Sequence, residues 1–416
     1  MAFSIWLGAC SQGAHGPEPM ANEAAGAPSA SPDGQSAGMP GGGASAAAGS
    51  GAGAPGAVPP TTDGGGPTSV TWKVIAESPD TNLFAGVPAA ASRIADGAVA
   101  YVESTNTAPS PARVVMQRFD ANGERLGSLI ALTEDPGGRS DVTLASDGRQ
   151  YAACWTTDLE VRCSLISEDA QVQPDTLALA GKNPTIAASP SGWALAYAAS
   201  DTRLLLQALS PALEPSGDPV ELTLSAQIRT QGHAPLFVAT PSGFALVGAG
   251  SEDGHDNLLR LSADLKPLAP ATPLGHDLWF SGQLVASDTR AALSLAAPYG
   301  AYLLFLNTAQ VTGEIVLGGG QKEGIDQALL LSRGGIGAAW LYSAGEIRQR
   351  FFADGHDHEV GLPTGRSPSS VPGTDGSDSY QQLVTVGDQV LILARARKRG
   401  NLAGDMAIRI ATLTFP

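Results

Sequence analysis

A unit of two short apolar strands joined by a tight polar turn recurs seven times between Ala91 and the C-terminus. The clearest copies are PTIAASPSGWALAYAAS, which begins at Pro184, and PLFVATPSGFALVGAGS, which begins at Pro235. The turns follow one another at intervals of about 44 to 53 residues, at Asp96-Gly97, Asp147-Gly148, Ser191-Gly192, Ser242-Gly243, Asp288-Thr289, Gly334-Gly335 and Gly387-Asp388. A period near fifty with several strands in each unit is the signature of a β-propeller that has one blade per repeat. The repeat therefore predicts an all-β fold, a seven-bladed β-propeller.

Each repeat divides into four expected strands, here called A to D. In the third repeat they are Thr185–Ser189, Trp193–Ala199, Arg203–Leu209 and Pro219–Leu224. Strands A and B are dense in Ala, Val, Leu and Ile, which predicts burial on both faces, whereas strands C and D alternate as expected of outer strands with one wet face. The C–D connections are rich in Asp, Asn, Gly and Pro, which predicts hairpins, as in DANGERLG from Asp120, SPALEPSGDP from Ser210 and ADGHDHE from Ala353.

The last repeat is one strand short. It supplies strands at Gln382–Val386, Gln389–Ala394 and Met406–Thr414, and then the sequence ends at Pro416. A strand-like segment, Ser69–Ala76, precedes the first repeat and has no partner of its own. Because a propeller closes its ring to hide its strand edges, we predict that Ser69–Ala76 supplies the fourth strand of the last blade.

Composition separates a linker from the repeats. Residues 11–68 consist almost entirely of small and polar residues and hold no Leu, Ile, Phe, Tyr or Trp. Such a segment cannot bury enough apolar surface to offset the entropy of ordering, so we predict a disordered linker over 11–68 and one propeller over 69–416. The formal net charge of −16 opposes the neutralisation of phosphates, which argues against nucleic-acid binding. There is no apolar run of 18 residues that could form a membrane-spanning helix, and we expect a monomer.

Cys10 follows Leu7-Gly8-Ala9, a pattern that resembles a bacterial lipobox, in which the cysteine is lipidated. The linker after it resembles the tethers of bacterial surface lipoproteins, and QRFDANGERLG resembles hairpins in the propeller repeats of bacterial secreted and surface proteins. The apolar stretch Ala2–Ala9 is shorter than an ordinary signal sequence, and no basic residue precedes it. The resemblance implies a partial signal peptide in residues 1–10, lipidation at Cys10 and attachment to the bacterial cell envelope (outer membrane or cell surface) by lipid alone. The alternative is a cytoplasmic chain with a chance match.

The two remaining cysteines lie in YAACWTTDLEVRCSL, which predicts two strands joined by a short turn. If Asp158-Leu159 is that turn, Cys154 and Cys163 face each other directly across the ladder, about 4.5–5.5 Å apart at Cβ. A small adjustment brings such a pair to disulfide distance, and an even pair of cysteines fits an oxidising compartment. We therefore predict a Cys154–Cys163 disulfide; the alternative is a pair of buried free thiols.

Binding groups gather on loops that a rigid scaffold positions. The A–B turns are short, whereas the long and variable connections are the B–C and D–A loops, which lie at the same end of a propeller. The polar and aromatic residues of these loops form the candidate binding face, and the alternative is that they are ordinary surface residues: Arg139, Asp141, Arg229, His233, His276, Asp277, Trp279, Lys322, Glu323, Asp326, Arg366 and Tyr380.

Catalytic motifs are absent from the sequence. It has no GxSxG elbow and no phosphate-binding loop, since Gly318-Gly319-Gly320-Gln321-Lys322 lacks the GK[ST] ending. The His356 and His358 pair and the acidic run near Asp375 are better explained as polar turns, so we predict no metal site and no cofactor. The leading hypothesis is a non-enzymatic binding module that presents its B–C and D–A loops to a protein or a glycan. The alternative is a carbohydrate-active hydrolase or lyase that uses acidic residues at the channel mouth, such as Asp141, Glu323 or Asp326.

Overall fold

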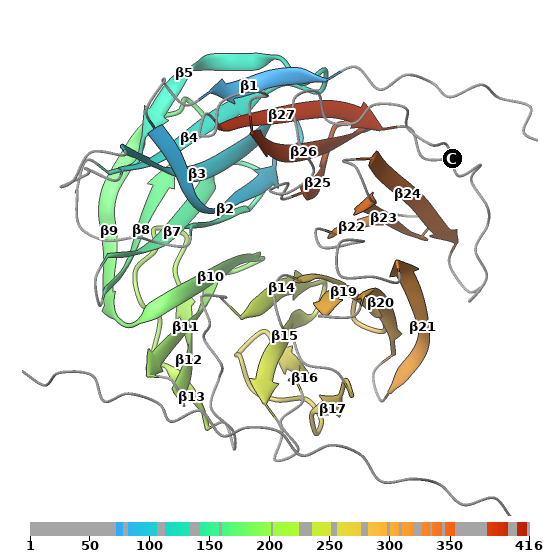
Figure 1. Ribbon diagram of the computed structural model, residues 1–416. Helices are drawn as coiled ribbons and strands as arrows, with labels where there is room; N and C mark the ends of the chain where they lie inside the picture. Colours follow the sequence, from blue (N-terminus) through green and yellow to red (C-terminus); the bar gives the residue numbers. More distant parts are fainter. Residues whose placement is uncertain are drawn as a thin grey trace, which may run out of the picture. The chain divides into compact units, whose positions relative to one another are not determined.

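The computed structural model describes residues 72–77, 82–105, 113–133, 142–157, 160–200, 203–223, 235–250, 256–275, 282–297, 300–307, 310–318, 327–332, 335–342, 346–353, 381–397 and 406–413. Every regular element in these residues is a β-strand (Figure 1). None of them belongs to a helix long and apolar enough to cross a membrane. The predicted signal peptide, Cys10 and the predicted linker 11–68 lie outside the described residues.

The strands form antiparallel sheets in which neighbours along the chain pair with each other. The first sheets are β2 (Asn82–Ser92), β3 (Gly97–Thr105), β4 (Arg113–Phe119) and β5 (Arg125–Ala131); β6 (Val142–Ser146), β7 (Tyr151–Thr157), β8 (Glu160–Ile166) and β9 (Val172–Ala180); and β10 (Lys182–Ser189), β11 (Gly192–Ser200), β12 (Arg203–Leu209) and β13 (Val220–Thr223). Next come β14 (Leu236–Thr240), β15 (Gly243–Gly250), β16 (Asp256–Ser262) and β17 (Thr272–Pro273); and β18 (Gly282–Ala286), β19 (Ala291–Ala297), β20 (Gly300–Leu306) and β21 (Val311–Gly318). The last are β22 (Gln327–Ser332), β23 (Gly335–Tyr342) and β24 (Glu346–Ala353); and β25 (Gln381–Val386), β26 (Gln389–Arg397) and β27 (Met406–Leu413) with β1 (Lys73–Glu77).

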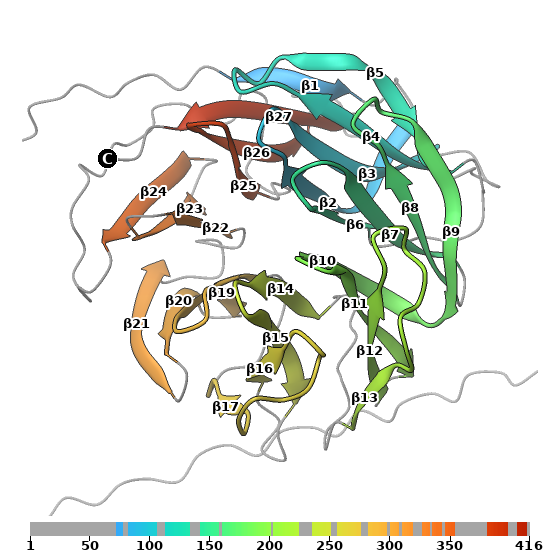
Figure 2. The same cartoon turned by 180° about the vertical axis from the view of Figure 1, so that it is seen from behind.

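The sheets follow one another in a cycle within the unit Thr62–Pro416. The inner strands contact each other in the order β2, β6, β10, β14, β18, β22 and β25, and β25 returns to β2 (Figures 1 and 2). Because each sheet packs face to face with the next and the last packs on the first, no sheet face at the inner strands is left without a neighbour. This cyclic packing of four-stranded antiparallel sheets is the architecture of a β-propeller.

The predicted number of four-stranded blades needs correction. The sequence predicted seven, whereas the described residues form six four-stranded blades. The remaining sheet in the cycle, made of β22, β23 and β24, has three strands among the described residues. The hairpin ADGHDHE and a strand after it were expected to complete this sheet. Apart from Ala353, they lie within residues 354–380, outside the described residues, so the fourth strand of this sheet stays a prediction.

β1 joins the N-terminal and C-terminal strands in one sheet, as the sequence predicted. It pairs antiparallel with β27, from Lys73 opposite Ile410 to Glu77 opposite Ala407, with an irregularity between Val74 and Ala76. Ile75 is buried between this sheet and the first one. The sheet therefore has four strands only because β1 comes from the opposite end of the sequence.

The hydrophobic core of the described residues is divided into layers that lie between neighbouring sheets. The layer between the first two blades contains Met116, Tyr151 and Trp155, and the next contains Trp193, Leu195 and both cysteines. Strand β7 is buried along its whole length, and the first seven residues of β11 are buried. This burial explains why the second strand of each repeat is a continuous apolar run, since both of its faces contact a neighbouring blade.

The Ser-Gly turns of the two clearest repeats are a steric requirement. A Cβ atom added at Gly192 would lie 2.3 Å from the carbonyl oxygen of Leu209, and one added at Gly243 would lie 2.1 Å from that of Leu261. Glycine is therefore the residue that lets strand C pass this close to the A–B turn. The repeated glycine reflects this close approach of two strands.

The C–D hairpins of the first four blades share one conformation. In each of these, a Ser or Asp side chain accepts at least one hydrogen bond from a backbone N–H group within the hairpin, as Ser210 does from Ala212 and Glu214. The fourth hairpin residue has a positive φ of about 60–75°, at Gly123, Ala170, Leu213 and Leu265. Leu213 and Leu265 are almost completely buried in the layer shared with the preceding blade. Two hairpins thus use a strained leucine to fasten one blade to another.

Candidate functional site

The alternation of antiparallel strands gives every blade two ends. The A–B turns and C–D hairpins lie at one end, called here the turn end, and the B–C and D–A connections lie at the other, called the loop end. At the turn end the structure describes the turns and hairpins of the first four blades. At the loop end the connections 106–112, 134–141, 224–234, 276–281, 319–326 and 398–405 lie outside the described residues, as do residues 354–380, which span the expected C–D hairpin and the D–A connection that follow β24.

The predicted binding residues belong to the connections of the loop end. All of them lie outside the described residues, so their predicted role stays a prediction: Arg139, Asp141, Arg229, His233, His276, Asp277, Trp279, Lys322, Glu323, Asp326, Arg366 and Tyr380. His356, His358 and Asp375 also lie outside the described residues, so their explanation as polar turns stays a prediction. What the structure supplies at this end is the rim of strand termini from which the connections leave.

Two of the ion pairs at this rim join neighbouring strands. In the first blade, Arg113 Nε lies 2.5 Å from Glu103 Oε2, where β4 begins and β3 nears its end. In the third blade, Arg203 donates from Nε and Nη2 to both carboxylate oxygens of Glu221, at 2.9 and 2.7 Å. Hydrogen bonding to Arg203 lowers the pKa of Glu221. The side chains of Arg113 and Arg203 are 47% and 53% exposed, so each arginine keeps N–H groups on the surface.

The turn end contains a buried charged cluster that sequence reasoning missed. The two oxygens of Asp96 accept from Arg93 Nε at 2.6 Å and Arg93 Nη2 at 2.8 Å, and Arg118 Nε donates to Oδ2 at 2.6 Å. The Tyr151 hydroxyl lies 3.1 Å from Asp96 Oδ1, and the Arg93 guanidinium lies 4.8 Å from the centre of the Tyr151 ring. Arg93 Nη1 also donates to the carbonyl of Arg149 at 2.7 Å. Because Tyr151 and Arg149 belong to the second blade, the cluster ties the first blade to the second.

The electrostatics of this cluster suit a structural role. Burial alone would raise the pKa of Asp96, but hydrogen bonds from Arg93 and Arg118, together with their charges, outweigh it and lower that pKa. Burial and the nearby Asp96 charge raise the pKa of Tyr151, which keeps the hydroxyl protonated. A carboxylate whose pKa is lowered and whose two oxygens both accept hydrogen bonds is poorly suited to take up a proton as a general base. The only sequence signal for this cluster was the Arg-x-x-Asp spacing in a turn, which is common on protein surfaces.

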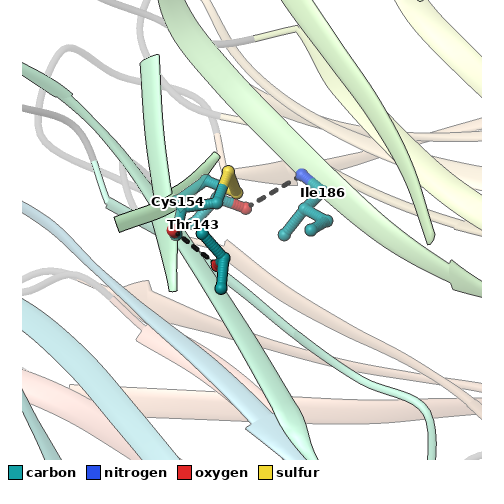
Figure 3. Close-up of a disulfide and its surroundings, with 5 residues drawn as sticks. Thr143, Cys154 and Ile186 are labelled. Carbon is teal, nitrogen blue, oxygen red and sulfur yellow. Dashed lines mark hydrogen bonds between the residues drawn. A yellow bond between two sulfur atoms is a disulfide. The ribbon is translucent and has the colours of Figure 1, made fainter. Parts of the chain in front are cut away.

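The predicted disulfide is confirmed. Cys154 on β7 is directly opposite Cys163 on β8, with a Cα–Cα distance of 4.1 Å, and the ladder around it has the predicted register. Figure 3 shows Cys154 beside Thr143, whose hydroxyl accepts a hydrogen bond from the backbone N–H of Ile186 in the next blade. Both cysteines are fully buried in the layer between the second and third blades. The disulfide is therefore part of a blade interface that solvent does not reach.

No group of three or more His, Cys, Asp or Glu that could hold a metal ion occurs among the described residues. The acidic side chains that are most buried there, Asp96 and Glu103, both contact arginine. The described residues therefore present ion pairs at both ends of the blades.

Comparison with known proteins bears on the fold. No protein-family model matches the sequence, and comparison with curated proteins finds no match. Among solved structures, U3-55K is similar at 11% identity over 82% of this chain and 98% of that chain, with a TM-score of 0.51. The RRP9 WD40 repeats are similar at 11% identity over 82% of this chain and 100% of that chain, with a TM-score of 0.50. The β-propeller domain of the Trilobed protease from Pyrococcus furiosus matches at 9% identity over 80% of this chain and 98% of that chain, with a TM-score of 0.46.

The likenesses to U3-55K and to the RRP9 WD40 repeats agree with the cyclic packing of the sheets. The protein is an all-β propeller with four-stranded antiparallel blades. At such low identity the likeness establishes the fold and transfers no activity, because propellers carry both enzymes and non-enzymatic scaffolds. A binding module is compatible with this fold.

Proposed function

We propose that this protein is a non-enzymatic binding module that presents the loop end of its propeller to a protein or a glycan. The observation that supports this proposal is the ion pairing of two carboxylates with arginines at the rim of the loop end. Glu103 and Glu221 are held by Arg113 and Arg203, and the arginines keep exposed N–H groups. Paired carboxylates and exposed guanidinium groups suit recognition by hydrogen bonding better than proton transfer.

The turn end supports the same proposal from the other side. Its hairpins and the Asp96 cluster join neighbouring blades through buried contacts, so the scaffold holds the loop end in place. Loops on a rigid scaffold lose less entropy when they bind than loops that must be ordered first. We place the binding residues among the connections of the loop end, with Trp279 and Tyr380 as the aromatic groups most suited to a glycan ring or a peptide side chain.

The binding test uses the full chain. Purified protein is mixed with insoluble peptidoglycan, chitin and xylan, and both co-sedimentation and the release of reducing ends are measured. We expect retention on at least one polymer without release, weakened by Arg113→Ala and by Trp279→Ala. Lys73→Ala is the control for the opposite end of the blades, because Lys73 forms an ion pair with Glu124 at the turn end.

The outcomes separate the alternatives. Release of reducing ends that is abolished by substitution of Asp141, Glu323 or Asp326 would establish a carbohydrate-active enzyme instead. Retention that Lys73→Ala weakens as much as Arg113→Ala would show that the loop end is not the binding face. Failure to bind any polymer would exclude the glycans tested and leave a protein ligand, which crosslinking of the full chain in envelope extracts would detect.

We also propose that the propeller is tethered to a bacterial cell envelope through a lipid on Cys10. The support is the LGAC pattern, the composition of residues 11–68 and a disulfide that fits an oxidising compartment. Stable anchoring takes more than one acyl chain. The protein, expressed behind a complete signal sequence, is expected to enter the detergent phase on phase separation, and Cys10→Ser is expected to remain in the aqueous phase. Equal partitioning of the two forms would refute the anchor.

A further inference from the structure

Arg260, on β16 in the fourth blade, is a buried arginine whose charge is incompletely paired. It is 7% exposed, and its Nη1 donates to the carbonyl of Ser287 in the turn of the next blade. Its Nε and Nη2 atoms are buried and have no hydrogen-bond acceptor among the described residues. The charge of Asp288 acts on Arg260, but the carboxylate of Asp288 accepts hydrogen bonds from Ser242 N at 2.8 Å and Ser242 Oγ at 2.7 Å. Buried N–H groups of a guanidinium are costly when they have no acceptor.

Arg93 shows what completes such an arrangement in the same protein. Its Nη1 also donates to a carbonyl in the turn of the next blade, that of Arg149. Its Nε and Nη2 atoms donate in parallel to the two carboxylate oxygens of Asp96. Arg260 makes the equivalent contact from Nη1 to a carbonyl of the next blade, that of Ser287. Its Nε and Nη2 atoms, which in Arg93 donate to Asp96, have no carboxylate as a partner among the described residues.

The backbone explains why the fourth blade supplies no carboxylate of its own. Arg118 and Arg260 occupy equivalent positions, two residues before the Asp120 and Ser262 that begin their C–D hairpins. Arg118 donates to Asp96, which lies just before Gly97, the partner of Phe119 in the ladder. In the fourth blade the equivalent ladder pair is Phe244 with Leu261, so Gly243 stands where Asp96 stands in the first blade. A side chain cannot be placed at Gly243 without a clash with the Leu261 carbonyl.

We propose that the Nε–Nη2 edge of Arg260 binds a small carboxylate, of the class of acetate and formate, which joins the fourth and fifth blades as Asp96 joins the first and second. The planar fork of a guanidinium matches a carboxylate through two parallel hydrogen bonds. Burial of Arg260 admits only a small ligand, and the nearby charge of Asp288 disfavours phosphate and other multiply charged anions. This site lies at the turn end, so it is independent of the proposed binding function of the loop end.

The test measures thermal unfolding of the full chain at pH 7 and constant ionic strength, with acetate replacing chloride. A ligand that binds only the folded state stabilises it by RT ln(1 + [L]/Kd), so the melting temperature keeps rising with the logarithm of the acetate concentration above Kd. We expect a rise of about 2 °C or more in the unmodified protein. Phosphate at matched ionic strength is expected to produce a smaller rise.

Substitutions assign the effect to this site. Arg260→Leu is expected to show no acetate-dependent rise and to unfold in chloride at least as high as the unmodified protein, because it removes a buried unpaired charge. Arg260→Lys keeps the charge without the fork and is expected to lose most of the rise. Lys73→Leu, at a partly exposed ion pair of the turn end, is the control and is expected to keep the rise. The proposal is overturned if acetate has no effect on the unmodified protein, or if Arg260→Leu and Arg260→Lys respond as fully as the control. Broadening of the carbon-13 acetate signal by the unmodified protein, absent with Arg260→Lys, provides a second readout.

Discussion

Replacing Ala170 and Leu213 by glycine is expected to change stability in opposite directions, although both residues occupy the fourth position of a C–D hairpin. Their φ angles are 62° and 61°, in the left-handed region. A residue other than glycine in that region destabilises the folded state by about 1–2 kcal/mol. Glycine avoids this strain but loses more conformational entropy on folding, which costs about 0.5–1 kcal/mol. Ala170 is only half-buried, so Ala170→Gly is expected to raise the free energy of unfolding by about 0.5–1 kcal/mol.

Leu213 differs because its side chain is completely buried between the second and third blades. Removing a buried leucine side chain costs about 2–5 kcal/mol, which exceeds the strain that glycine relieves. Leu213→Gly is therefore expected to lower stability by about 1–4 kcal/mol. Leu213→Ala loses nearly the same contacts and keeps the strain, so it is expected to be less stable than Leu213→Gly.

The assay is urea unfolding followed by tryptophan fluorescence, since Trp155 and Trp193 are buried in the layers on either side of β7 and β8. The expected order of midpoints is Ala170→Gly, unmodified protein, Leu213→Gly and then Leu213→Ala. A midpoint for Leu213→Gly at or above that of the unmodified protein would show that the leucine does not fasten the blades. A lower midpoint for Ala170→Gly would show that the hairpin is not strained.

Three further predictions concern closure, covalent linkage and pH. Deleting Lys73–Glu77 removes the backbone hydrogen bonds to β27, each worth about 0.5–1.5 kcal/mol, and is expected to lower the melting temperature. Deleting residues 11–65 is expected to leave the melting temperature unchanged. Equal melting temperatures for the two deletions would mean that the ring closes in another way. Cys154→Ser combined with Cys163→Ser is expected to cost about 3 kcal/mol, and two alkylatable thiols in freshly isolated unmodified protein would contradict the disulfide. Because the pKa of Asp96 is lowered from 3.8, the contribution of its charge to the free energy of unfolding is fully present above about pH 4 and is lost as the pH falls further. Asp96→Asn is therefore expected to be less stable at neutral pH, by about 3 kcal/mol, and to lose less stability on acidification than the unmodified protein. Parallel plots of stability against pH for the two proteins would oppose this.

The parts of the fold that the sequence predicted are those governed by local pattern. The fifty-residue period, the apolar strands β7 and β11 and the turn at residues 158–159 followed from alternation and turn chemistry, and the turn then placed Cys154 opposite Cys163. The pairing of β1 with β27 followed from counting strands, because an incomplete last repeat and an extra first strand complement each other.

The contacts that join the blades could not be predicted in this way. Arg93 and Asp96 looked like an ordinary surface turn, and nothing in a single repeat shows that Tyr151 from the next blade covers them. A leucine with a positive φ has no propensity signal, although the recurrence of Ser-x-x-Leu at Ser210 and Ser262 was visible in the sequence. These features depend on the distance between neighbouring sheets, which spacing along the chain does not encode.

The position of β1 also decides where the N-terminal segment meets the propeller. Lys73 begins β1, and its ammonium group contacts Glu124 and the carbonyl of Asn122 in the C–D hairpin of the first blade, which places Lys73 at the turn end. Any attachment through the residues before Lys73 therefore reaches the propeller at the turn end, and the loop end points away from it. Tension on that attachment would act first on the pairing of β1 with β27, so the strand that completes the sheet would also be the one that bears an external pull.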